Sequence, residues 1–158
     1  MAGVSIFRTG IEPAWIDYNG HLRDAYYGLI VSYAIDALMD RIGLDEAYRT
    51  RTGCTLYTLE MHIYYLREVK STATVATDVR ILGADRKRIH AAFDLRCDPA
   101  TESAAVAEVM LLQVRQTEGV ASEPFAPAIV AAIEELQRAY ADLPPPSQGS
   151  RRMQLPQR

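Results

Sequence analysis

The chain has 158 residues, of which 49% are hydrophobic and 23% charged, and its formal net charge is −3 at pH 7. This length predicts one globular domain with a sizeable core, and the weak negative charge excludes bulk attraction to nucleic acid or anionic lipid. No apolar stretch is long enough to span a bilayer, and the N-terminus lacks the pattern of a signal peptide, so we expect a cytoplasmic protein. Two isolated cysteines, Cys54 and Cys97, form no CxxC pair and are expected to be reduced, buried thiols.

The first half of the chain predicts a strand, a long helix and more strand. β-Branched and aromatic residues favour a strand at 4–11, before Pro13. From about residue 22 to 42, apolar residues recur at helical spacing and also occupy the other faces, a pattern typical of a buried helix. Gly43 is expected to end that helix. Residues 52–69 are rich in Thr, Tyr, Leu and Ile and predict one long strand or two abutting ones.

The second half predicts further antiparallel strands and a short helix. Residues 72–83 alternate and stop at a turn, and residues 87–97 follow as a hairpin partner. Residues 103–116 are another strand candidate, although their alanines also permit a helix. Residues 126–143 show a helical pattern with a proline in the first turn.

This element order indicates an α+β fold in which an antiparallel sheet wraps round the long helix. One sheet edge would remain uncovered, which predicts dimerisation by edge pairing. We expect a single domain over residues 1–143. The Pro-, Gln- and Arg-rich residues 144–158 are expected to form a flexible tail.

The element Asp17-Tyr18-Asn19-Gly20-His21, which leads into the long helix, resembles the D-x-x-G-H element of hotdog-fold acyl-CoA thioesterases of the 4-hydroxybenzoyl-CoA thioesterase type. The resemblance extends over about residues 4–140. WIDYNGHLRDAYY, TLEMHIYYLREV and DRKRIHAAFDL are similar, more narrowly, to the betainyl-CoA thioesterases of bacterial carnitine breakdown. The resemblance implies a hotdog fold that hydrolyses an acyl-CoA, with no cofactor besides that substrate. Many relatives carry Asn-Asn or Asn-Glu after the His, where this chain has Arg23-Asp24.

Thioester hydrolysis needs a group that activates water or attacks the carbonyl, and donors for the developing oxyanion. The resemblance makes Asp17 the general base or nucleophile, whereas the residues alone favour a helix cap or an Asx-turn. The amides of Gly20, Leu22 and Arg23 are expected to be unpaired donors at the helix N-terminus. His21 is expected either to fix the turn or to position the substrate.

Glu60 is a second candidate catalytic residue. Strict strand alternation places it on one face with Thr58, His62 and Tyr64, a polar face that suits a pocket better than a core. Burying a carboxylate is costly unless it is paired or protonated. Glu60 is therefore either in the active site or paired with an Arg of a neighbouring strand or subunit. The three histidines are not spaced as metal ligands, and we expect no metal site.

Aromatic residues around both carboxylates are candidates for binding the acyl group: Trp15, Tyr18, Tyr26, Tyr27 and Tyr64. Trp and Tyr rings bind quaternary ammonium groups, so, together with the resemblance, they predict betainyl-CoA (glycine betaine-CoA) as substrate. The alternative is that several of these rings pack in the core or at a dimer interface. The candidate contacts for the CoA phosphates are cations, at positions Arg67, Arg86, Lys87 and Arg88, although most such runs are solvated hairpin ends.

Three functions are compatible with these features. The first is a homodimeric or tetrameric thioesterase with sites at the subunit interface, and the Asp-x-x-Gly-His arrangement favours it. The second is a hotdog acyl-CoA hydratase or dehydratase, which would use a His–carboxylate pair. The third is a non-catalytic acyl-CoA sensor, which would normally add a basic nucleic-acid-binding segment that this sequence lacks. In each case the partner is a small acyl-CoA, with no nucleic acid and no membrane.

Overall fold

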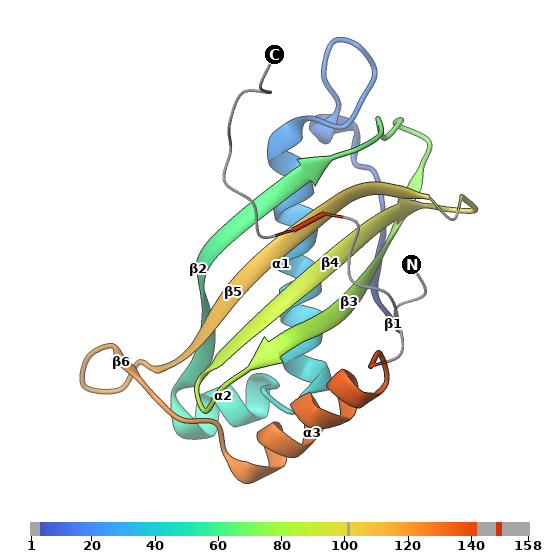
Figure 1. The fold of residues 1–158 in the computed structure, drawn as a ribbon. Coiled ribbons are helices and arrows are strands. Elements are labelled where there is room, and N and C mark those ends of the chain that lie inside the picture. Colours follow the sequence, from blue (N-terminus) through green and yellow to red (C-terminus); the bar gives the residue numbers. More distant parts are fainter. Residues whose placement is uncertain (1–3, 101, 142–147, 150–158) are drawn as a thin grey trace, which may run out of the picture.

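The computed structural model describes residues 4–100, 102–141 and 148–149. One antiparallel sheet forms the body of the protein, and a long helix lies along one of its faces (Figure 1). The order across the sheet is β1 (Val4–Gly10), β3 (Thr74–Ala84), β4 (Arg88–Cys97), β5 (Ser103–Arg115) and β2 (Cys54–Tyr65), and the short β6 (Ala121–Ser122) pairs with β5. The helices are α1 (Asp24–Arg41), α2 (Glu46–Thr52) and α3 (Pro127–Arg138), with a 3-10 turn, η1, at Pro13–Trp15.

The C-terminus of α1 is closed by the glycine that the sequence predicted. Gly43 has a φ of +86°, in the left-handed region that glycine adopts most readily. Its amide donates to the carbonyl of Asp40 at 3.2 Å, and the amide of Leu44 donates to the carbonyl of Met39 at 2.8 Å. This pair of bonds is a Schellman motif, which ends α1 and turns the chain towards α2.

The core lies between α1 and the helix-facing side of the sheet. Ile30, Val31, Ala34 and Leu38 of α1 are fully buried, as is Phe93 of β4. The expectation that α1 is buried on every side was wrong. Ser32, Tyr33 and Asp36 are exposed, because the sheet of a single chain curls round only one side of the helix.

Most predicted strands and helices are present with shifted ends. The segment predicted at 103–116 is a strand, β5 (Ser103–Arg115), and not a helix: it pairs with both β4 and β2, and its alternate Ala105 and Ala107 lie in the hydrophobic core. The sequence missed η1, α2 and β6. The predicted tail 144–158 lies outside the described residues except for Gln148 and Gly149. None of the helices in the described ranges is long and apolar enough to cross a membrane.

Candidate active site

The loop between β1 and α1 folds back on the carboxylate of Asp17. Its Oδ1 atom accepts the amides of Asn19 at 2.8 Å and His21 at 3.1 Å. The Asp17 amide donates to the His21 carbonyl at 2.8 Å, and Gly20 turns the chain with a φ of +82°. The hydrogen bond from the His21 amide is the main reason that the pKa of Asp17 lies below its usual value. The Asx-turn geometry is thus present, and it also presents an ionised, half-buried carboxylate just before α1.

The expected oxyanion donors before α1 are already engaged, so that prediction was wrong. The Gly20 amide donates to the Asp17 carbonyl at 3.1 Å, the Leu22 amide to Val69 at 2.8 Å, and the Arg23 amide to Trp15 at 3.0 Å. These bonds build the loop itself. The helix starts one residue later than the donors we expected, at Asp24.

The first turn of α1 offers one open amide. The Tyr26 amide donates to the Arg23 carbonyl at 3.1 Å, and the Ala25 amide donates to Oδ1 of Asp24 at 2.9 Å. The Asp24 amide has no acceptor among the described residues, as expected for a helix N-terminus without a side-chain cap. Because this amide lies at the N-terminus of α1, it is also at the positive end of the helix dipole.

His21 connects this loop to the segment that follows β2. Its Nε2 atom lies 3.1 Å from Oε2 of Glu68, and its backbone forms an isolated bridge with Lys70. The His21 ring is half-buried, whereas Glu68 is largely exposed. The pair brings together, at the N-terminal end of α1, two residues 47 positions apart. No local pattern had singled out Glu68.

Two aromatic pairs flank the first turn of α1. Tyr26 stacks on Trp15, with ring centroids 5.5 Å apart and an interplanar angle of 18°. Tyr27 meets Tyr65 of β2 edge to face, at 5.1 Å and 88°. The Tyr65 hydroxyl donates to the Asp24 carbonyl at 3.2 Å. Aromatic rings are therefore gathered at the first turn of α1, and Tyr65 contacts the residue that carries the open amide.

Comparison with known proteins identifies the family. The family model of the thioesterase-like superfamily matches residues 11–141. The chain is 43% identical to a betainyl-CoA thioesterase of Pseudomonas aeruginosa, over 97% of this chain and 96% of that protein. The chain belongs to the thioesterase-like superfamily. The predicted resemblance and the enzyme class, thioester hydrolase, are thereby confirmed.

Other relatives agree with this assignment. An L-carnitine dehydrogenase/betainyl-CoA thioesterase of Agrobacterium fabrum is 36% identical over 80% of this chain and 25% of its own length. A solved structure from Pseudomonas putida KT2440 superposes with a TM-score of 0.86 at 41% identity, covering 99% of both chains. A Staphylococcus aureus protein solved in complex with CoA gives 0.87 at 25% identity, covering 99% of this chain and 98% of its own. These neighbours confirm the predicted α+β hotdog fold of this thioesterase.

Two of the predicted acyl-binding tyrosines point away from the Asp17 loop. Tyr18 is 92% exposed, so its ring contributes no wall to the site of this chain. Tyr64 precedes Tyr65 on β2, and because side chains alternate along a strand it lies on the face turned away from α1. Tyr65 takes the place that we expected Tyr64 to occupy, whereas Trp15, Tyr26 and Tyr27 do lie beside the first turn of α1.

Glu60 is not brought together with Asp17 in this thioesterase. Its side chain is 67% exposed and lies 2.9 Å from Nε2 of His62, so the expectation of a buried carboxylate was wrong. β2 is an edge strand, and a β-bulge between Thr58 and Glu60 breaks its alternation. Five residues of strand, about 17 Å, separate Glu60 from Tyr65, which reaches the first turn of α1.

The predicted CoA contacts fall at the two ends of the sheet. Arg86, Lys87 and Arg88 lie at the turn between β3 and β4, the end opposite the loop that precedes α1 (Figure 1). Arg88 is paired with Asp85, whose pKa it helps lower to about 2. Arg67 lies beyond β2 at the Asp17 end, and Nη2 is 2.9 Å from Oε1 of Glu102. A single chain therefore does not unite the four cations around Asp17.

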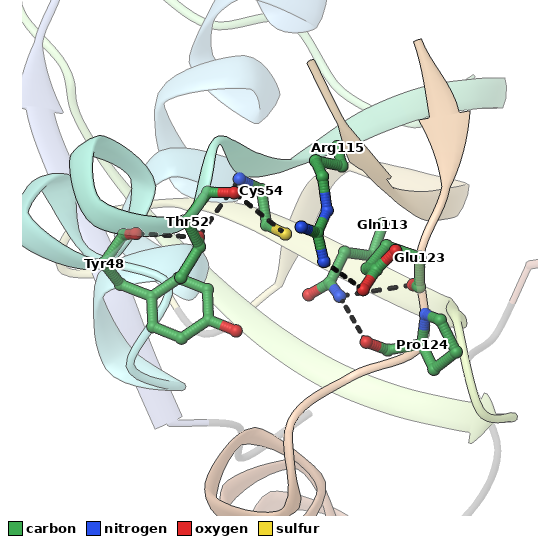
Figure 2. Close-up of polar contacts among 7 residues, drawn as sticks. All are labelled: Tyr48, Thr52, Cys54, Gln113, Arg115, Glu123 and Pro124. Atoms are coloured by element: carbon green, nitrogen blue, oxygen red, sulfur yellow. Dashed lines mark hydrogen bonds and ion pairs between the residues drawn. The ribbon is translucent and has the colours of Figure 1, made fainter. Parts of the chain in front are cut away.

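A separate polar cluster lies at the far end of α1 (Figure 2). The fully buried Gln113 donates from Nε2 to the carbonyls of Glu123 at 3.2 Å and Pro124 at 2.8 Å. Arg115 forms an ion pair with the Glu123 carboxylate. The thiol of Cys54 is buried beside them, and both cysteines are free. These bonds fasten the segment between β6 and α3 to the sheet, a structural role.

In the described part of the chain, no group of three His, Cys, Asp or Glu side chains could hold a metal ion. Sequence reasoning missed Glu68 and the amide of Asp24, and it chose Tyr64 where the structure places Tyr65 at the first turn of α1. Alternation along the strand could have indicated Tyr65 in place of Tyr64, because it decides which of two successive rings faces the helix. Nothing in the sequence indicates which amides of the preceding loop are already paired.

Proposed function

We propose that this protein hydrolyses betainyl-CoA to glycine betaine and free CoA. The observation that carries the proposal is the near-full-length similarity to a betainyl-CoA thioesterase. The ionised carboxylate of Asp17 beside the N-terminus of α1 supports it, because thioester hydrolysis requires a base or nucleophile close to donors that stabilise an oxyanion.

In this proposal Asp17 acts on one of two routes. As a general base it removes a proton from water, whose oxygen bonds to the thioester carbon. As a nucleophile it bonds to that carbon itself, and water hydrolyses the resulting anhydride. On either route the C–S bond breaks and the CoA sulfur leaves as a thiolate that takes up a proton. No cofactor besides the CoA thioester is needed.

The amide of Asp24 is the proposed oxyanion donor. It points out of the first turn of α1 and has no acceptor among the described residues. A thioester oxygen placed there would accept this amide's hydrogen bond and lie at the positive end of the helix dipole. The Asp17 carboxylate precedes this turn by seven residues of a loop that folds back on itself.

We further propose that the working unit is a cytoplasmic homodimer joined along β2. This strand is a sheet edge with exposed apolar side chains, including Leu59 at 54% and Tyr57 at 38%, and such edges favour strand pairing. A twofold axis beside β2 pairs the two β2 strands antiparallel, so that the two sheets have their β3–β4 turns at opposite ends. The partner's copies of Arg86 and Lys87 would then lie at the Asp17 end of the first chain, where CoA phosphates require cations. Two free thiols fit a reducing compartment.

Two substrates test the proposal together. The purified protein is assayed for free thiol release from betainyl-CoA and from 3,3-dimethylbutanoyl-CoA, in which a neutral tert-butyl group replaces the trimethylammonium group. We expect hydrolysis of both, with kcat/KM at least about tenfold higher for betainyl-CoA, or about 1.4 kcal/mol of discrimination. Equal kcat/KM values for the two thioesters would contradict betainyl-CoA as the specific substrate, but the protein would still be an acyl-CoA thioesterase. No thiol release from any acyl-CoA, with hydration of an enoyl-CoA, would favour the hydratase instead.

A further inference from the structure

The chemistry of a betainyl thioester limits where its charge can be recognised. A single methylene separates the quaternary nitrogen from the thioester carbonyl carbon. Any group that binds the cation must therefore stand directly beside the donors that bind the carbonyl oxygen. Those donors lie at a helix N-terminus, whose partial positive charge repels a cation, so the protein must offset that repulsion locally.

Tyr65 stands at this position. It is the last residue of β2, and its hydroxyl donates to the Asp24 carbonyl at 3.2 Å. Its ring packs against Tyr27 at 88°, yet the residue remains 54% exposed, whereas Tyr27 is only 4% exposed. The two contacts hold the Tyr65 ring at the first turn of α1, with its surface open to a ligand. An electron-rich ring face held in this way is the group that binds a quaternary ammonium.

Asp24 supplies negative charge at the same turn. Its exposed carboxylate accepts the amide of Ala25 at 2.9 Å and is the acidic residue of the first turn of α1. The carboxylate offsets the dipole where a cation would approach. Among the nearby cations, Arg67 is paired with Glu102, which reduces the competing positive charge.

We propose that the ring of Tyr65 and the carboxylate of Asp24 recognise the trimethylammonium group of the acyl chain and so determine specificity for a cationic acyl-CoA. This inference rests on the proposed function and names the selectivity residues of the same site. In the proposed reaction, the side chains of Tyr65 and Asp24 do not take part in breaking the C–S bond. Their removal should therefore act on one substrate class and spare the other.

The first test removes the ring. Tyr65→Leu should lower kcat/KM for betainyl-CoA at least tenfold and leave 3,3-dimethylbutanoyl-CoA within about threefold, whereas Tyr65→Phe, which keeps the ring, should retain most of the preference. Tyr33→Leu is the matched control, because Tyr33 is 42% exposed and also packs against one ring, that of Phe7. It should change neither value.

The second test removes the negative charge of Asp24 and leaves the contact between Tyr65 and Tyr27 in place. Asp24→Asn should lower the betainyl to dimethylbutanoyl ratio several-fold, whereas Asp36→Asn, on the exposed face of α1 about 18 Å further along the helix, should leave it unchanged. An unchanged ratio in both Tyr65→Leu and Asp24→Asn, or a parallel loss on both substrates, would overturn this inference alone. Equal rates of the wild type on both substrates would overturn it together with the proposed substrate, and the reaction class would stand.

Discussion

The Oδ1 atom of Asp17 accepts the backbone amide of His21, four positions further along the chain, at 3.1 Å. This bond fixes the carboxylate and lowers its pKa. A carboxylate with a lowered pKa is a weaker base but is ionised over a wider range of pH. The loop therefore positions the Asp17 carboxylate beside α1 and does not increase its basicity.

The pH dependence of the reaction follows from the direction of this shift. The ionised form of Asp17 is present above its pKa, and the lowered pKa moves the loss of that form to pH values below the ordinary 3.8. We therefore expect that protonation of Asp17 does not lower kcat/KM between pH 7 and pH 5. The pH–rate profiles of the wild type and of His21→Gln check this. An acid limb above pH 5 that persists in His21→Gln would contradict the assignment.

The contact between Glu68 and His21 predicts a positioning role for Glu68. Glu68→Gln removes the negative charge 3.1 Å from Nε2 of His21, and we expect kcat/KM to fall about fivefold, equivalent to about 1 kcal/mol. Glu134→Gln, which removes the partner of the exposed Arg138 on α3, is the control and should leave kcat/KM unchanged. No fall of kcat/KM in Glu68→Gln, or an equal fall in the control, would contradict the positioning role.

The exposed β2 edge predicts that one charge can separate the subunits. Leu59→Lys places a cation at the middle of this edge, and we expect a monomer in light scattering after size-exclusion chromatography, with activity lost if the partner completes the site. Val120→Lys introduces the same charge at a residue that is 62% exposed beyond β5, and it should remain dimeric and active. A wild-type monomer with full activity would rule out the proposed assembly.

The position of Arg86 predicts an effect confined to the nucleotide end of the substrate. Arg86→Glu should raise KM for betainyl-CoA about five- to tenfold and leave hydrolysis of the N-acetylcysteamine thioester, which lacks the nucleotide, unchanged. Arg138→Glu, on the exposed surface of α3, is the charge-matched control. If both thioesters lose activity equally in Arg86→Glu, the cation does not act through CoA phosphate.

The main elements of the fold were predictable because their signals are local. Helical spacing and Gly43 predicted the end of α1, and alternation with a turn predicted β3 and β4. Residues 46–52 were missed because EAYRTRT has no apolar periodicity. Only its ends mark it as a helix: Asp45 caps the amide of Tyr48 at 2.8 Å, and Gly53 closes it at a φ of +70°.

The site was less predictable because its geometry depends on contacts distant in sequence. The motif located Asp17, yet which amides remain open depends on Val69 and Trp15, to which Leu22 and Arg23 donate. Strict alternation placed Glu60 on one face with His62, which it contacts at 2.9 Å, but composition does not show that this face is exposed on an edge strand. Which amides are paired and which strand face is exposed depends on contacts between residues distant in the sequence, and a single sequence does not show these contacts.

The central claim is that the carboxylate of Asp17 carries out thioester hydrolysis. Asp17→Asn keeps an oxygen that can accept the Asn19 and His21 amides, so the loop should persist with the charge removed. Asp45→Asn is the matched control, because Asp45 also accepts a backbone amide through Oδ1 but lies beyond the C-terminus of α1. The decisive measurement is kcat for free CoA release from betainyl-CoA, with melting temperature measured alongside. We expect a fall of about 10²–10⁴-fold in Asp17→Asn and wild-type activity in Asp45→Asn. Activity of Asp17→Asn within a few-fold of wild type would contradict it.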